Sequence, residues 1–157
     1  LVSRCITAGG QSLSVRSSDG FGLYMPWSDS LAVSTIFVFT DGEIWAVDTL
    51  SLGTLQEFIS LDERMFAASL DQCAKFLADL NIPGPYRWIA GFEGVNGRYL
   101  PRPNDRFNRK SGPCASDVIE EKGTFNFGES ASAALESFFE KIFDQCGLAR
   151  PNTQSNS

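Results

Sequence analysis

The chain has 157 residues, of which 43% are apolar and 20% charged, with a formal net charge of −6. This length suits one domain with one core, and no apolar run is long enough to span a bilayer, so we expect a soluble, cytoplasmic protein without a membrane partner. The chain has no histidine, which excludes Ser-His-Asp and Cys-His catalysis. Its four cysteines form no C-x-x-C pair, so no metal or cofactor is predicted, and free core thiols are favoured over disulfides.

The first third of the chain predicts short antiparallel strands. Runs at 12–17 and 21–25 flank a turn, and residues 26–30 predict a loop because proline cannot donate a ladder hydrogen bond. Runs at 33–40 and 43–49 then flank the dipeptide Asp41-Gly42, which favours a two-residue type I′ turn. Since both faces of these strands carry apolar groups, we expect this hairpin to be central in the sheet.

Two amphipathic helices are predicted in the rest of the chain. The first covers about 62–81 and begins at the capping residue Asp62, and the second covers about 130–147 with a phenylalanine-rich stripe. Between them, residues 86–91 and the dipeptide Asn96-Gly97 predict a second hairpin. The expected fold class is α+β: a twisted, mainly antiparallel sheet covered on one face by two amphipathic helices. It forms a single domain over 1–150, with a flexible tail at 151–157.

Positive charge is concentrated between residues 98 and 110, where five basic residues and one aspartate give a net charge of +4 and leave −10 elsewhere. Arginine side chains suit phosphate oxygens, and neighbouring aromatic rings could stack on a base. The other interpretation, favoured by the frequency of such runs, is a solvated loop that docks against the acidic remainder of the chain. The candidate ligand-binding residues are Arg98, Tyr99, Arg102, Arg106, Phe107, Arg109 and Lys110.

A second candidate group follows the basic segment. Asp117, Glu120 and Lys122 are the residue types that bind Mg²⁺ and orient water in some nucleases. Such three-residue combinations arise readily by chance, and an exposed polar turn before a strand-like run at 124–127 is the favoured interpretation. They are therefore candidate catalytic residues without a supporting motif.

Two stretches carry a family resemblance: 84–98, which reads GPYRWIAGFEGVNGR, and 134–143, which reads ALESFFEKIF. They resemble the C-terminal part of bacterial DNA-binding proteins that carry an upstream Schlafen-type AlbA-like domain. The resemblance implies a bacterial cytosolic protein with a nucleic-acid or defence-related role, in which the upstream domain holds the functional residues. Neither stretch is a catalytic motif, so the resemblance implies no activity for this chain.

The leading hypothesis is a non-catalytic accessory or interaction domain of a larger bacterial cytosolic protein. Such a domain would pack against other domains of the same parent protein and present the basic loop to nucleic acid, a nucleotide or another anionic partner. One alternative is a metal-dependent phosphodiesterase or nuclease that uses Asp117 and Glu120 with Lys122. Another is a structural dimerisation module, whose partner would be a second copy of the chain.

Overall fold

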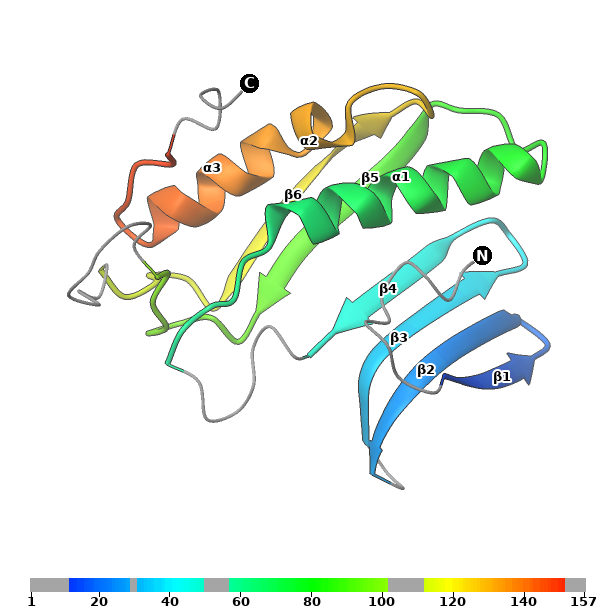
Figure 1. Ribbon diagram of the computed structural model, residues 1–157, viewed down its shortest axis with the longest axis horizontal. Helices are drawn as coiled ribbons and strands as arrows, with labels where there is room; N and C mark the ends of the chain where they lie inside the picture. The colour runs from blue at the N-terminus through cyan, green and yellow to red at the C-terminus, as the bar shows by residue number, and fades with distance from the viewer. Residues whose placement is uncertain (1–11, 29–30, 50–56, 102–111, 152–157) are drawn as a thin grey trace.

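The computed structural model describes residues 12–28, 31–49, 57–101 and 112–151 (Figure 1). In chain order the elements are β1 (Leu13–Ser17), β2 (Gly20–Ser28), β3 (Leu31–Phe39), β4 (Ile44–Asp48), α1 (Glu63–Asp79), β5 (Tyr86–Glu93), β6 (Val118–Phe125), α2 (Ala131–Ala134) and α3 (Glu136–Gln145). All strand pairs in these elements are antiparallel. The predicted α+β class is confirmed.

The strands form two sheets where the sequence predicted one. β1 to β4 form a four-stranded meander in the order β1-β2-β3-β4, and β5 pairs with β6. The helices α1 and α3 lie on the same face of the β5–β6 sheet (Figure 1), as predicted for two amphipathic helices. The hairpin predicted to be central contributes β3, which has neighbours on both sides, and β4, which is an edge strand of this sheet.

Two local predictions for the four-stranded sheet are wrong in detail. Of the loop predicted at 26–30, residues 26–28 belong to β2, because register shifts on both sides of Pro26 accommodate the missing amide hydrogen, and residues 29–30 lie outside the described residues. The Asp41-Gly42 turn is not type I′, since Gly42 has a φ of 91° while Asp41 does not have a positive φ. The Gly42 amide donates to the Phe39 carbonyl and the Phe39 amide to the Glu43 carbonyl, which fits a longer turn with a glycine bulge.

The second predicted hairpin is also wrong, although its turn exists. The Arg98 amide donates to the Val95 carbonyl at 3.0 Å across Asn96-Gly97. The chain after this turn pairs with residues near the start of α1, where Tyr99 forms a parallel bridge with Phe58. β5 therefore takes its partner, β6, from a distant part of the sequence.

The outer boundaries of the two predicted helical segments are confirmed by their caps, but the second segment consists of two helices instead of one. The Asp62 carboxylate accepts a hydrogen bond from the Arg64 amide at 3.1 Å at the start of α1. The Ser130 hydroxyl accepts one from the Ala133 amide at the start of α2, and Leu135 separates α2 from α3. Gly147, with a φ of 63°, ends the second helical segment in the left-handed conformation that glycine adopts without strain.

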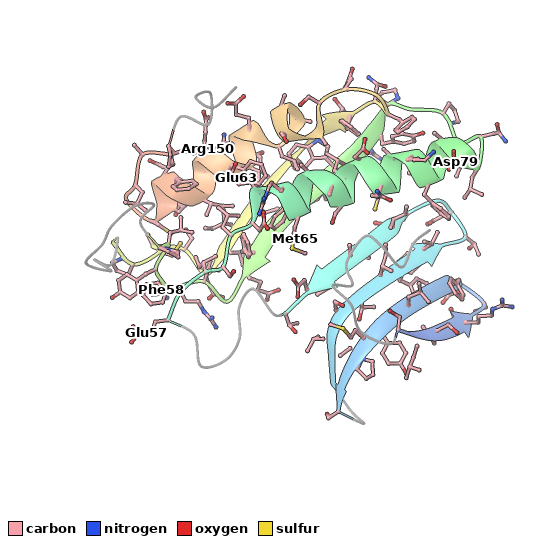
Figure 2. All side chains as sticks on the ribbon, in the orientation of Figure 1. Glu57, Phe58, Glu63, Met65, Asp79 and Arg150 are labelled. Atoms are coloured by element: carbon pink, nitrogen blue, oxygen red, sulfur yellow. The ribbon has the colours of Figure 1, made fainter. Side chains whose placement is uncertain are left out.

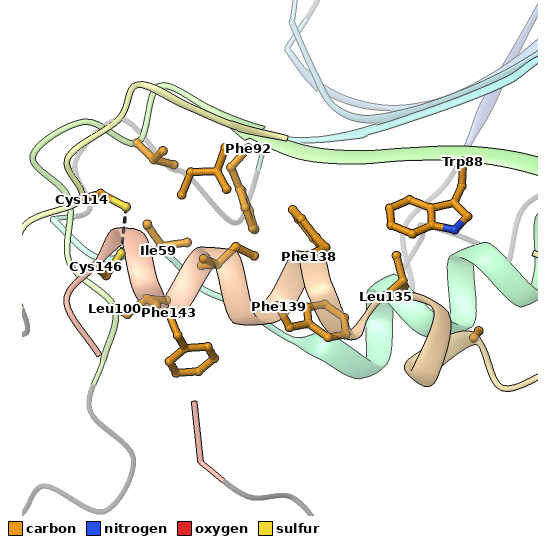
Figure 3. Packing of buried hydrophobic residues seen from close by; sticks show 14 of the residues in the cluster. Ile59, Trp88, Phe92, Leu100, Cys114, Leu135, Phe138, Phe139, Phe143 and Cys146 are labelled. Atoms are coloured by element: carbon orange, nitrogen blue, oxygen red, sulfur yellow. Dashed lines mark hydrogen bonds between the residues drawn. The ribbon is translucent and has the colours of Figure 1, made fainter. Parts of the chain in front are cut away.

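The core lies between the β5–β6 sheet and the helices (Figure 3). The ring of Phe66 from α1 packs on Phe92 and Phe138 with ring centroids 5.4 Å and 5.2 Å away, and on Phe139 at 6.1 Å. No described residue of the four-stranded sheet belongs to this cluster, whose buried members are Ile59, Ala74, Trp88, Phe92, Val95, Leu100, Cys114, Ile119, Phe125, Ala131, Leu135, Phe138, Phe139, Ile142, Phe143 and Cys146.

The segment after α3 is fixed to the start of α1. The Arg150 guanidinium binds both carboxylate oxygens of Glu63, with N···O distances of 2.7 Å and 3.0 Å, and lies 5.2 Å from the Phe139 ring centroid (Figure 2). This bidentate pair raises the pKa of Arg150. Arg150, the last residue of the predicted domain, is thus part of the described structure, while the tail predicted at 151–157 lies outside the described residues except for Pro151.

Candidate functional site

The basic segment is described at its start only. Arg102, Arg106, Phe107, Arg109 and Lys110 lie outside the described residues.

Arg98 and Tyr99 are half-buried. The Tyr99 amide donates to the Glu57 carbonyl at 2.9 Å, its carbonyl accepts from the Ile59 amide at 2.8 Å, and its ring centroid lies 6.3 Å from that of Phe58. Tyr99 is therefore integrated into the fold by its backbone and one ring contact, and its role in ligand binding stays a prediction.

The predicted carboxylate group does not form a metal-binding site. Asp117, Glu120 and Lys122 are exposed, and Glu120 and Lys122 lie two residues apart on the same side of β6. In the part of the chain that the structure describes, no three His, Cys, Asp or Glu side chains come together in a way that could hold a metal ion. The arrangement gives no geometric support to the nuclease hypothesis.

Glu121 lies beside these residues on β6, and two neighbouring groups stabilise the ionised form of its carboxylate. Its pKa is lowered by the Lys122 amide and then by Lys141, whose ammonium lies 3.3 Å from a Glu121 carboxylate oxygen. The same ammonium donates to the Glu120 carbonyl at 2.7 Å. Lys141 thereby fastens α3 to β6, and this charge cluster has a structural function.

A shallow surface depression lies between the end of α1 and the loop after β6. Its polar groups are bonded within the chain: the Tyr86 hydroxyl donates to the Ile82 carbonyl at 2.8 Å, and the Asn126 side-chain amide donates to Glu129 at 3.0 Å. The depression therefore presents few free polar groups to a ligand. It is lined by Ala78, Asn81, Ile82, Pro83, Gly84, Tyr86, Asn126 and Phe127.

One face of the four-stranded sheet carries a set of exposed apolar side chains. Residues directly paired across antiparallel strands point to the same face, so the register defines which side chains share it. We call this the apolar face, and it consists of three cross-strand rows: Leu13, Tyr24, Thr35 and Val47; Val15, Gly22, Phe37 and Trp45; and Ser17, Gly20 and Phe39. None of these residues is charged.

The apolar face is exposed most at its two edge strands. The exposed fractions are 48% for Leu13 and 43% for Val15 on β1, and 58% for Trp45 and 51% for Val47 on β4. A buried side chain of this sheet, Ile36, belongs to the opposite face, since it pairs with Leu23 and Ala46. The apolar face is thus open at its two edge strands, while Tyr24, Phe37 and Phe39 between them are half-buried.

Two glycines lie beneath an aromatic ring in the middle of the apolar face. A Cβ atom placed on Gly22 would lie 2.6 Å from the Phe37 ring, and one placed on Gly20 would lie 2.7 Å from it. The Phe37 ring therefore lies across both glycines, and its centroid is 4.6 Å from that of Phe39. The aromatic rings of Phe37 and Phe39 therefore occupy the space above the two glycines, between two apolar edges.

Comparison with known proteins adds no relative. No family model matches the chain, and neither the curated proteins nor the solved structures contain a match. Among the described residues, no helix is both long and apolar enough to cross a membrane.

The apolar face was not found from the sequence. The sequence shows apolar residues at every second position, Leu13 and Val15 in one segment and Trp45 and Val47 in another. This pattern also fits strands with one buried face. Only the register between four strands shows that these side chains share a face, and only burial shows that this face is open.

Proposed function

We propose that the chain is a non-catalytic interaction domain that binds another folded protein domain through its apolar face. The observation that carries the proposal is the group of four large apolar side chains, Leu13, Val15, Trp45 and Val47, exposed on one uncharged face. Apolar patches of this kind commonly mark protein interfaces, because burying them removes apolar area from water.

The chemistry of the apolar face favours protein over nucleic acid. Binding to nucleic acid requires lysine or arginine to neutralise phosphates, and the three rows contain neither. The centres of protein interfaces, by contrast, are poor in charge and rich in aromatic residues such as Trp45 and Phe37. The partner that fits is therefore an uncharged, apolar protein surface.

The shape of the face favours a folded domain over a peptide. The Phe37 ring lies across Gly20 and Gly22, and the exposed apolar side chains lie on both edge strands, so the face spans the width of the sheet and suits a folded domain better than one extended or helical segment. A second domain of a longer bacterial parent protein is the partner implied by the family resemblance, and the proposal adopts it. A second copy of the chain is the competing partner.

Photo-crosslinking in cells that produce the full-length protein tests this proposal. A photoreactive phenylalanine analogue is placed at position 45, and the matched control carries it at position 89, where Ile89 is 70% exposed on β5. We expect a discrete adduct at position 45 with another domain or protein, no adduct at position 89, and loss of the first adduct when Val47→Lys is added.

Two outcomes would overturn the proposal. The first is an adduct yield at position 45 no greater than at position 89. The second is an adduct between two copies of the chain, together with a dimer in light scattering that Trp45→Lys converts to a monomer. Because Trp45 and Val47 are exposed, both lysine variants should keep their stability within about 0.5 kcal/mol, which urea unfolding checks.

The basic segment, from Arg98 to Lys110, is proposed as a separate contact with an anionic group. This part of the proposal is supported by the segregation of +4 charges in an otherwise acidic chain. Charge reversal of Arg102, Arg106 and Arg109 should weaken binding to single-stranded DNA or a nucleotide, and more strongly at low salt, since phosphate contacts release counterions. Unchanged binding across a salt titration would refute this contact and leave the apolar face untouched.

A further inference from the structure

Two buried thiols lie in contact at one end of the core. The Sγ atoms of Cys114 and Cys146 are 2.8 Å apart, and the two residues are 1% and 0% exposed (Figure 3). Cys114 lies in the segment before β6, and Cys146 follows α3 directly. The contact thus joins two parts of the chain that are 32 residues apart.

The backbone holds both residues in place. The Cys114 amide donates to the Arg98 carbonyl at 2.7 Å, and the Cys114 carbonyl accepts from the Gly97 amide at 3.0 Å. The Cys146 amide donates to the Phe143 carbonyl at 3.1 Å within the last turn of the helix. The backbone of each cysteine is therefore fixed, and only its side chain has to rotate to move the sulfur atom.

Neighbouring residues tie the two segments together. The Ala115 amide donates to the Gln145 carbonyl at 3.2 Å, and the Ser116 hydroxyl donates to the Gln145 side-chain oxygen at 2.8 Å. These bonds flank the thiol pair in sequence on both segments, so the contact between the sulfur atoms is part of a defined junction.

We propose that Cys114 and Cys146 form an intramolecular disulfide that links the segment before β6 to the end of α3. An S–S bond measures about 2.05 Å, so the two sulfur atoms need to approach by only roughly 0.8 Å, which small side-chain rotations supply. Among the described cysteines, Cys114 and Cys146 are both buried and in contact, whereas Cys73 lies on α1 and is half-buried.

The bond forms by two thiol–disulfide exchange steps with a low-molecular-weight disulfide, such as oxidised glutathione. The thiolate of one cysteine attacks the oxidant, forms a mixed disulfide and releases one glutathione thiol. The thiolate of the other cysteine then attacks the cysteine sulfur of the mixed disulfide and releases the second glutathione thiol. Two protein thiols lose two electrons and two protons, and the oxidant takes them up.

Burial sets the order of folding and oxidation. Burial, followed by the hydrogen bond with Cys114, raises the pKa of Cys146 to about 12, so the folded chain offers almost no Cys146 thiolate at neutral pH. The exchange therefore takes place while this junction is open, during folding or local unfolding. Once the junction closes, the same burial shields the bond from reductants.

Peptide mapping of the full chain tests the proposal. The chain is refolded with reduced and oxidised glutathione, remaining thiols are blocked with N-ethylmaleimide in guanidinium, and tryptic peptides are analysed by mass spectrometry. We expect residues 111–122, with Cys114, to be joined to residues 142–157, with Cys146. Because the fold holds the thiols together, reducing the bond in the folded chain should need a glutathione redox ratio roughly 100- to 1000-fold more reducing than in denaturant.

Two variants make the test specific. Cys73→Ser should leave the joined peptides unchanged, and Cys146→Ser should remove them. The proposal is overturned if Cys114 and Cys146 are both blocked by N-ethylmaleimide after oxidative refolding, or if Cys114 is joined to Cys5 or Cys73 instead. Should Cys146→Ser fail to fold, the peptide map of the unmodified chain still decides between these outcomes.

Discussion

The indole of Trp88 lies directly over Gly123 across the β5–β6 pair. The two residues are direct partners in the strand register, and a Cβ atom placed on Gly123 would lie 2.7, 2.8 and 2.9 Å from three atoms of the Trp88 indole. Such distances are shorter than real Cβ contacts. Glycine at position 123 is therefore required to let the indole lie against the strand, inside the core.

We expect Gly123→Ala to destabilise the chain by about 1–3 kcal/mol, the usual range for overpacking a core. The indole cannot move away freely, because Trp88 is buried against the cluster that includes Leu135. Trp88→Leu removes the obstructing ring and should make Gly123→Ala nearly neutral. The coupling energy in this double-mutant cycle should then be about 1 kcal/mol or more.

Urea unfolding followed by far-UV circular dichroism measures all four members of the cycle. Thr124→Ala is the matched control, since Thr124 is the next residue on β6 and is exposed, and its effect should stay within about 0.5 kcal/mol. The reasoning fails if Gly123→Ala costs no more than this control. It also fails if the effects of Gly123→Ala and Trp88→Leu are additive, because the steric explanation requires coupling.

Three further predictions concern the junctions of the core. Arg150→Ala should lower the free energy of unfolding by about 1–3 kcal/mol, since it removes a bidentate charge-assisted pair with Glu63; an effect equal to that of Arg150→Lys would refute the bidentate explanation. Asp62→Ala should cost about 1 kcal/mol at neutral pH because it removes the cap of α1. The Arg64 side chain lowers the pKa of Asp62 below 3.8, so this carboxylate stabilises the fold above that value and loses its contribution as the pH falls through the folded-state pKa; a difference between wild type and variant that persisted in acid would contradict this. The chain crosslinked between Cys114 and Cys146 should unfold with about 4 kcal/mol more free energy than the reduced chain, as expected for a loop of this length, and equal urea midpoints would contradict the loop-closure argument.

Local signals in the sequence were sufficient for the helices. Asp62 caps α1 as expected, and Ser130 and Gly147 lie at the two ends of the second predicted helical segment, because capping depends on backbone groups within a few residues. The turn at Asp41-Gly42 was located correctly, but its type depends on the φ of Asp41, which a dipeptide motif does not determine.

Long-range pairing could not be predicted in the same way. The turn at Asn96-Gly97 exists, yet β5 pairs with β6, because the segment after the turn bonds to the residues around Phe58 instead. The division into two sheets and the open apolar face depend on such tertiary choices. Of the predicted site residues, Asp117, Glu120 and Lys122 are exposed as expected, but the polar turn predicted for them is wrong, because Glu120 and Lys122 lie on β6.

The separation of the four-stranded sheet from the phenylalanine cluster has a consequence for dynamics. Its strands are joined by short connections in sequence order, whereas the cluster is assembled from residues between Ile59 and Cys146. Because no described residue of this sheet belongs to the cluster, we expect the sheet to open as a separate cooperative unit of lower stability. In native-state hydrogen exchange, the amides of β2 and β3 should exchange through such partial opening, while those of β5 and β6 should require global unfolding. A partner bound on the apolar face would then slow hydrogen exchange in β2 and β3 selectively. The exchange rates of these amides would therefore report binding.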